Sequence, residues 1–286
     1  MATQHVRTAP AAVGTATRVS LVVVGAGLLL SLLARDAVTA AGPVLLGLAA
    51  LAGLPHGAAD VTLIGRGLRP LMTYALAAAL ALGVALAFPG PALVVLLVLS
   101  VAHFAEGEQA FDRLRGGAGR LVPALAVGWS TIALPVGLHP DAVRGLLTDL
   151  DPGVASAVLS PAGRVALVGP AAVLVALALG RADTRLRLEI ALGVALLAVA
   201  PPLVGFAVWF AGWHAVRHMA RVVAEDPDGP GVLGLLRATA WPSLVAAAGI
   251  AALVVVAGTV PPAVVLGLLA LTVPHAVVVV RELRPA

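Results

Sequence analysis

The stretch from Val204 to His218 reads VGFAVWFAGWHAVRH, an apolar run that ends in two histidines four residues apart. The part from Val204 to Trp213 is apolar enough to lie within a membrane. On an α-helix, a spacing of four residues places two side chains about 40° apart and roughly 6 Å along the axis. His214 and His218 can therefore face one point, where one metal ion would bind both imidazoles.

Composition places the whole chain in a membrane. Of 286 residues, 60% are hydrophobic and 11% are charged, with a mean hydropathy of +1.05, whereas a soluble domain has about 25% charged residues. All 18 basic residues are arginine, and the net charge of +4 comes from a few loop residues and indicates no nucleic-acid interface. We therefore expect an all-α, polytopic transmembrane helical bundle.

Apolar runs separated by turn residues predict about ten membrane spans, because a bilayer core of about 30 Å takes roughly 20 apolar residues. The weakest boundaries are the splits at Pro201–Pro202 and Pro261–Pro262, since proline either separates two helices or kinks one. The ranges 186–219 and 236–280 are each too long for one span, which favours separate helices. The predicted spans are 19–34, 38–56, 70–88, 91–106, 121–138, 163–180, 186–200, 202–219, 236–257 and 261–280.

The arginines predict the orientation of these spans. With the N-terminus inside, the cytoplasmic segments carry 14 of the 18 arginines, as the positive-inside rule requires of short loops. We therefore expect both termini on the cytoplasmic side of the cell (inner) membrane, with residues 1–18 as a flexible tail and 19–286 as a single transmembrane domain. The longest outside segment, 139–162, is expected to hold a short interfacial helix and a loop. The 14 arginines are Arg7, Arg18, Arg66, Arg69, Arg113, Arg115, Arg120, Arg181, Arg185, Arg187, Arg217, Arg221, Arg281 and Arg284.

Two further histidines end earlier apolar runs, His56 in the sequence GLPHGAAD and His103 in AHF. The second, fourth and eighth predicted spans all run inward, so these two share one depth with His214 and His218. His275, in the tenth span, lies deeper but within reach of the same cavity. A single histidine at a helix end is often only a capping residue. Four ionisable side chains at one level near the hydrocarbon core indicate function instead.

A transition metal in this chain would have to bind histidine nitrogen and carboxylate oxygen, because the chain has no cysteine. Four imidazoles suit Fe(II), Zn or Cu. Asp60, Glu106 and Glu108 follow His56 and His103 closely in the sequence. We expect these acids to accept hydrogen bonds from metal-bound imidazoles, and the alternative is that they are solvated charges at the membrane surface.

Taken together, these motifs resemble those of the Brp/Blh family of membrane β-carotene 15,15′-dioxygenases. The resemblance rests on GLPHGAAD, on His103-Phe104 with acids behind it, on WHAVRH and on Val273-Pro274-His275, in the family's order along the chain. One position departs from the family pattern. Ala105 stands where glycine usually follows His-Phe, and we expect its methyl group to narrow the approach to the metal.

The resemblance implies a single transmembrane catalytic domain with one non-haem Fe(II), which cleaves the central double bond of β-carotene with O₂ to give two molecules of retinal. It also implies that Asp60 lies just outside the ligand shell and that His275 lies close to the site. The iron ligands carried over by motif are His56, His103, His214 and His218.

The implied substrate is a long apolar molecule dissolved in the bilayer, so we expect it to approach from the side, between helices. Aromatic residues make up only 3% of the chain, and five of them lie near the predicted site. We predict that they line a tunnel for the polyene, with ordinary helix packing as the alternative. They are Phe104, Phe206, Trp209, Phe210 and Trp213. A rhodopsin apoprotein is considered as an acceptor of retinal, although no residue encodes a contact with it.

Two other classes of function stay open on the sequence. A transporter or channel would use the histidines for protons or metal ions, but Glu189 is the only acid well within a predicted span. A haem-binding electron carrier would use axial histidines from two helices. Membrane di-iron desaturases need more histidines than this chain offers.

Overall fold

The computed structural model describes residues 8–65, 67–226 and 229–282. These residues form helices and no strands, which confirms the predicted all-α bundle. The elements are α1 (Thr8–Leu33), α2 (Arg35–Ala58), α3 (Asp60–Ile64), α4 (Leu68–Ala87), α5 (Pro89–Leu114), α6 (Leu121–Leu138), α7 (Pro140–Leu150), α8 (Pro152–Leu159), α9 (Pro161–Arg181), α10 (Thr184–Val199), α11 (Pro202–Trp209), the π-helix η2 (Phe210–Ala215), α12 (Val216–Glu225), α13 (Gly231–Ala257) and α14 (Val260–Glu282).

Within the described residues, eight helical segments are long and apolar enough to cross a membrane, and each corresponds to one of the ten predicted spans. The other two predictions fall on α10, which has 16 residues, and on the run α11–η2–α12, which a π-helix divides. The separations predicted at Pro201–Pro202 and Pro261–Pro262 are confirmed, because α10 ends at Val199 and α13 ends at Ala257. The orientation with both termini inside stays a prediction.

The N-terminal segment differs from the predicted flexible tail. Helix α1 begins at Thr8, so residues 8–18 belong to a helix. The reason is packing, because Val13 and Ala16 are buried against Phe111 and Ala220. The rest of the predicted tail, residues 1–7, lies outside the described residues.

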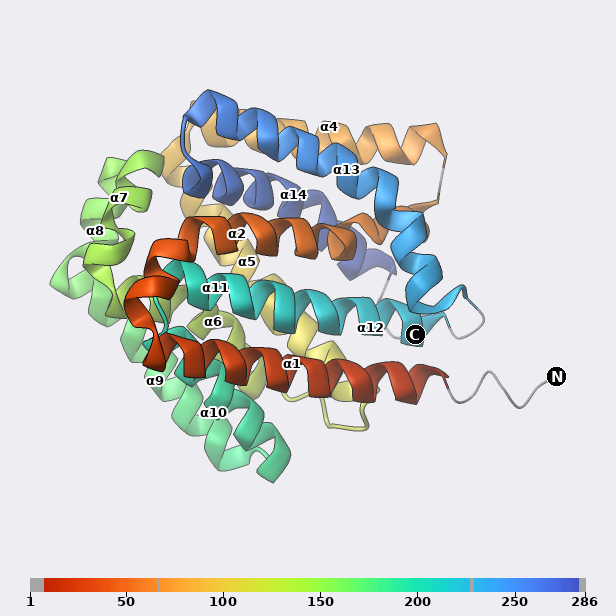
Figure 1. The fold of residues 1–286 in the computed structure, drawn as a ribbon, viewed down its shortest axis with the longest axis horizontal. Helices are drawn as coiled ribbons and strands as arrows, with labels where there is room; N and C mark the ends of the chain where they lie inside the picture. Colours follow the sequence, from red (N-terminus) through yellow and green to blue (C-terminus); the bar gives the residue numbers. More distant parts are fainter. Residues whose placement is uncertain (1–7, 66, 227–228, 283–286) are drawn as a thin grey trace.

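The segment expected to hold one interfacial helix and a loop forms two short helices, α7 and α8. Pro140 and Pro152 occupy the first turns of these helices, where no backbone N–H is required. The Asp151 carboxylate accepts a hydrogen bond of 2.7 Å from the Val154 N–H and so caps α8. The two helices pack against each other at one end of the bundle (Figure 1).

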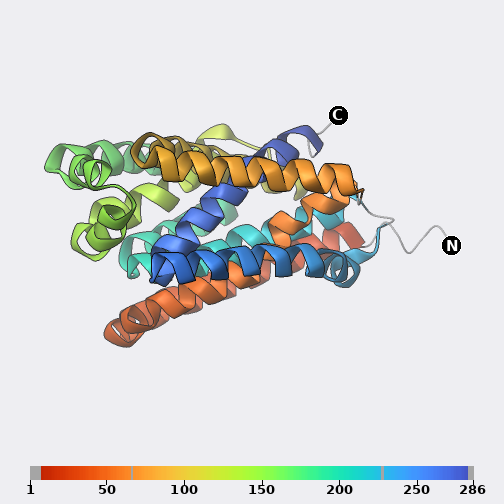
Figure 2. The same ribbon diagram turned by 90° about the horizontal axis from the view of Figure 1, so that it is seen from above.

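The helices that carry the histidines pack around a common centre. Helix α14 contacts both α2 and α5, and η2 contacts the same two helices. Helix α14 also contacts α4 and α13, and Figure 2 shows it running between them. In α4 and in α13, only 6% of the spanning window is buried. These two helices therefore present most of their surface to the outside of the bundle, while the histidine helices are more deeply buried.

Candidate metal centre

Five histidines meet at one place inside the bundle, from α2 (His56), α5 (His103), η2 (His214), α12 (His218) and α14 (His275). All five are buried. Ring centroids lie 5.1 Å apart for His56 and His214, and 5.0 Å apart for His103 and His214. The histidines predicted from the sequence to lie at one depth are therefore also close to one another in space.

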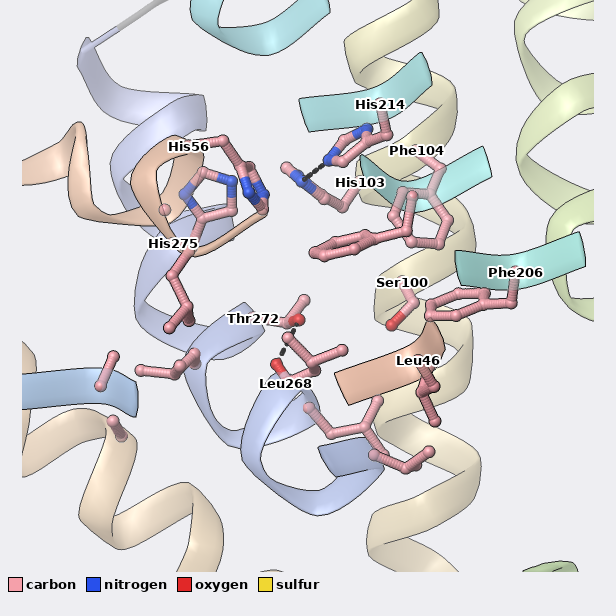
Figure 3. Close-up of a pocket in the computed structure, with 18 of the residues that line it drawn as sticks. Leu46, His56, Ser100, His103, Phe104, Phe206, His214, Leu268, Thr272 and His275 are labelled. Atoms are coloured by element: carbon pink, nitrogen blue, oxygen red, sulfur yellow. Dashed lines mark hydrogen bonds between the residues drawn. The ribbon is translucent and has the colours of Figure 1, made fainter. Parts of the chain in front are cut away.

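Three of the predicted ligands turn ring nitrogens toward a common point. Candidate ligand atoms of His56, His103, His214 and also His275 all lie within 4.8 Å of one another. His103 Nε2 and His214 Nε2 are 3.2 Å apart. Nδ1 of His56 contacts the carbonyl oxygen of Gly53, which accepts its proton and leaves Nε2 free for a metal. Figure 3 shows these four rings at one end of a cavity.

His218, the fourth predicted ligand, joins the cluster beside the other three. It belongs to a second group of candidate ligand atoms, with Asp60 and His275, again within 4.8 Å of one another. Its ring centroid lies 5.5 Å from that of His56. Among the described residues, Nε2 of His218 has no hydrogen-bond partner although it is buried. A buried polar nitrogen of this kind is costly unless a metal or a water molecule binds it.

The segment that carries His214 is wound more loosely than an α-helix. Residues Phe210–Ala215 form a π-helical turn between α11 and α12. As a result Trp209 stacks on His214, with ring centroids 5.7 Å apart and planes 14° apart, whereas five residues along a regular α-helix would separate the side chains by about 140°. Such π-turns often occur at functional sites. The sequence predicted a regular α-helix for this segment, so the π-turn was not predicted.

His275 lies within the cluster and not merely beside it. Its ring centroid is 5.0 Å from that of His56 and 4.7 Å from that of His103. Its Nδ1 is 3.0 and 2.9 Å from the two carboxylate oxygens of Asp60, which is fully buried. The Tyr74 hydroxyl bonds to the same carboxylate. Asp60 therefore contacts His275, although its place in the sequence pointed to His56, and Tyr74 carried no sequence signal beyond being the single tyrosine of the chain.

Glu106 and Glu108 bond to other partners than the expected imidazoles. Glu106 accepts hydrogen bonds of 2.8 and 3.0 Å from Arg221. Glu108 accepts one of 2.7 Å from the Trp213 indole and one of 2.8 Å from Arg217. The physical reason is that guanidinium groups on the neighbouring helix offer charged donors, which bind carboxylates more strongly than a neutral ring does. These bonds tie α5 to the run η2–α12, and among the described residues no hydrogen bond joins either acid to a ring of the cluster.

Two arginines that the sequence suggested as topology signals are buried next to the site. Arg217 and Arg221 have 3% and 2% of their surfaces exposed. Arg217 also donates a hydrogen bond of 2.9 Å to the buried Glu189, which accepts one of 2.6 Å from Arg115. A sequence signal for this role existed, because residues 214, 217, 218 and 221 have the spacing of one helix face.

An apolar cavity of about 450 Å³ opens from the histidine cluster. Three of the five aromatic residues predicted for a tunnel line this cavity, namely Phe104, Phe206 and Phe210. Figure 3 shows Phe104 and Phe206 beside the histidine end. Trp209 and Trp213 are not among its described lining residues, which corrects the prediction for these two. Both are fully buried, and Trp209 packs edge-on against Phe104 at 4.8 Å. The physical reason is that each indole has a partner on α5, which is Phe104 for Trp209 and the Glu108 carboxylate for Trp213.

The cavity wall away from the histidines offers few free polar groups. Ser100, Thr131 and Thr272 each donate a hydrogen bond to the backbone carbonyl four residues earlier, at 2.8 to 2.9 Å. Their hydroxyls are thereby satisfied within their own helices. The free ring nitrogens of the cavity are concentrated at its histidine end, and the rest of the wall suits a long apolar ligand.

Helices α4 and α13 supply the outer wall of the cavity. On α13 the lining includes Trp241 and Val245, which are 72% and 55% exposed. The cavity therefore extends to a surface that would face lipid. The lining residues on these two helices are Leu71, Tyr74, Ala75, Ala78, Trp241, Pro242, Val245 and Ala246.

Ala105, the departure from the family pattern, contacts helix α6. A Cβ atom placed on Gly128 of α6 would lie 3.0 Å from Cβ of Ala105, 2.8 Å from its backbone nitrogen and 2.6 Å from the carbonyl oxygen of Val101. Helices α5 and α6 thus approach closely at Gly128, and the Ala105 methyl fills that contact. The expectation that this methyl narrows the approach to the metal is therefore wrong.

The donors of this site fit a transition metal that prefers nitrogen. The cluster combines buried imidazoles with one carboxylate that bonds to a ring, in a chain without cysteine.

A family model described as beta-carotene 15,15′-dioxygenase matches residues 47–281, a range that contains Asp60 and every histidine of the cluster. No curated protein and no solved structure matches the chain.

Proposed function

Because this chain belongs to the β-carotene 15,15′-dioxygenase family, we propose that it cleaves the central double bond of β-carotene with O₂ to give two molecules of retinal. The observation that carries the proposal is the continuity between a buried histidine cluster and an apolar cavity. A metal site alone or an apolar cavity alone would suit many functions. Together they suit a reaction between a redox metal, O₂ and a substrate dissolved in the bilayer.

We assign Fe(II) to the cluster, with His56, His103, His214 and His218 as the residues that would hold it. Imidazole donors without thiolate support this choice, as does the family's dioxygenase description. Bound there with open coordination positions, Fe(II) would supply the one-electron chemistry that O₂ needs to react with a polyene. The protein would orient the rings, through the Gly53 carbonyl at His56 and through the π-turn at His214.

The cavity would hold the polyene by apolar and aromatic contact. Phe104, Phe206 and Phe210 lie next to the histidine end, and their ring faces can pack along a conjugated chain. The wall hydroxyls of Ser100, Thr131 and Thr272 already donate to backbone carbonyls, so they attract water less than free hydroxyls would. A dry wall protects reactive intermediates from side reactions with water.

The substrate would come directly from the bilayer, in keeping with a chain in the cell (inner) membrane. The cavity lining on α4 and α13 extends to exposed residues such as Trp241, while α7 and α8 pack over the bundle end. A carotenoid could therefore enter the cavity laterally, between α4 and α13, without leaving the lipid. Retinal would leave by the same path toward an acceptor such as a rhodopsin apoprotein.

Expression in cells that accumulate coloured β-carotene tests the activity. We expect the cells to lose their colour and to form two molecules of retinal for each β-carotene consumed, and to do neither without oxygen. Unchanged colour in aerated cells that contain folded, iron-loaded protein would overturn the proposal.

The two other classes make different predictions for the same purified protein. A transporter would carry ions across liposome membranes, and a haem carrier would show a Soret band. Glu189, the only acid well within a predicted span, bonds to Arg115 and Arg217 and is only 1% exposed. Its carboxylate is thus engaged in an ion network, which favours the oxygenase over the transporter.

A further inference from the structure

We propose that His275 binds the metal directly, and that Asp60 and Tyr74 hold its ring in the orientation that this requires. The inference rests on the proposed metal site, since His275 can be a ligand only if a metal occupies the cluster. It adds a residue from α14 to the four histidines of α2, α5, η2 and α12.

The position of His275 supports this role first. Its ring lies 5.0 Å from that of His56, 4.7 Å from that of His103 and 5.0 Å from that of His218, measured between centroids. It is also the one histidine that belongs to both groups of candidate ligand atoms found in the described residues. A metal bound by the first group would therefore lie within reach of His275.

The hydrogen bond at Nδ1 of His275 is a second argument that the other ring nitrogen binds the metal. Nδ1 of His275 faces both carboxylate oxygens of Asp60, and an ionised carboxylate can only accept hydrogen bonds. With Asp60 ionised, Nδ1 carries the proton, which leaves the lone pair on Nε2. Within the described residues that Nε2 is buried and has no hydrogen-bond partner. A ring fixed in this tautomer by a carboxylate behind it is the usual arrangement of a metal-binding histidine.

Asp60 and Tyr74 make this arrangement rigid. Asp60 opens helix α3, just after α2, and none of its surface is exposed. A buried carboxylate among membrane helices is costly and needs partners, and it finds them in His275 on α14 and in the Tyr74 hydroxyl on α4. One carboxylate thus joins three parts of the bundle behind the His275 ring. A purely structural anchor would explain the pairing but not the unpartnered Nε2 on the opposite side of the ring.

Titration of the purified full chain with Co(II) distinguishes a metal-binding His275 from a His275 that only anchors the helices. Co(II) is stable in air, and its visible absorption reports the number and arrangement of nitrogen ligands. We expect His275→Ala to weaken Co(II) binding by roughly 100-fold or more and to change the spectrum, because losing even a residue that only supports a ligand costs about 10–100-fold. Asp60→Asn should weaken binding within that range and Tyr74→Phe by less. Added imidazole should restore the original spectrum in His275→Gly.

Thr272→Ala is the matched control, because Thr272 lies one turn earlier on the same helix and bonds only to its own helix at Leu268. It should bind Co(II) like the unmodified chain. Unchanged affinity and spectrum in His275→Ala would overturn the role of His275 while leaving the proposed function intact. Failure of the unmodified chain to bind Co(II) would overturn the metal site and the proposed function together. If His275→Ala does not fold, His275→Gln replaces it in the titration, and an unchanged spectrum there would overturn the inference equally.

Discussion

The guanidinium carbon of Arg217 lies 3.6 Å from the centroid of the Trp213 indole ring, and both side chains donate hydrogen bonds to Glu108. Each of these residues directly precedes one of the two histidines of the η2–α12 run. The stack therefore ties this run to α5 at the two positions next to the proposed ligands. Such charge-assisted hydrogen bonds can hold a segment that contains a π-turn in one orientation.

Neutralising Glu189, the buried acid that binds Arg115 and Arg217, should destabilise the protein. In Glu189→Gln, the buried guanidinium groups of Arg115 and Arg217 lose a charged acceptor that is itself 1% exposed. Removing one partner of a buried ion pair costs about 3–5 kcal/mol, and we expect the lower end because Arg217 keeps Glu108. Thermal unfolding in detergent measures the effect. Asp141→Asn, at an exposed pair with Arg144, is the control and should unfold like the unmodified chain. Equal unfolding temperatures for the two variants would contradict this prediction.

Removing a proposed ligand should abolish iron binding and activity without preventing insertion. We expect His214→Ala to lose bound iron and retinal formation, since its Nε2 faces that of His103 at 3.2 Å. Metal analysis of the purified protein and product analysis in β-carotene-accumulating cells measure the two effects. His139→Ala is the control, because His139 precedes α7 and contacts the carbonyl of Ala198. Full activity in His214→Ala would rule out the proposed ligand set.

The sequence could predict that histidines from separate helices meet, but not how each one is held. The ends of the apolar runs placed His56, His103, His214 and His218 at one depth, and the structure brings their rings together. The bond between Asp60 and His275 joins residues 215 positions apart, which no local spacing encodes.

The π-turn was equally out of reach of the sequence. Nothing in the apolar pattern separates a π-turn from an α-helix, so Trp209 and Trp213 seemed as able to line the cavity as Phe206 and Phe210. Trp213 lies inside the turn and bonds to Glu108, while Trp209 lies just before it and packs against Phe104, so both indoles are buried between helices. Side-chain direction near such a turn depends on tertiary packing, which a periodicity argument cannot include.

Adding a methyl group where α5 and α6 touch should destabilise the bundle. In Gly128→Ala, the new Cβ would lie 2.6 Å from the Val101 carbonyl oxygen and 2.8 Å from the Ala105 backbone nitrogen. Backbone atoms cannot move aside, so the helices must separate, at a cost of about 1–3 kcal/mol. Thermal unfolding of Gly128→Ala and of Gly128→Ala combined with Ala105→Gly checks the reason. The second substitution should not restore stability, because it removes only the 3.0 Å contact between the two Cβ atoms. Full rescue would mean that the side chain, and not the backbone, sets the distance.

Blocking the proposed substrate entrance between α4 and α13 should slow carotenoid cleavage while iron stays bound at the histidines. Ala78 lines the cavity, and Leu80 on the same helix is 61% exposed and lies outside the described lining. We expect Ala78→Trp to lower the rate of retinal formation by at least about tenfold, because a bulky ring would fill the space through which the substrate must pass. Leu80→Trp places the same ring in lipid and should leave the rate unchanged. Bound iron should be equal in the two variants, which distinguishes a closed path from a damaged site. Equal cleavage rates at equal iron content would show that the substrate reaches the histidines by another route. The α7 end of the cavity, lined by Val143 and Leu147, would then be the next place to test as an entrance.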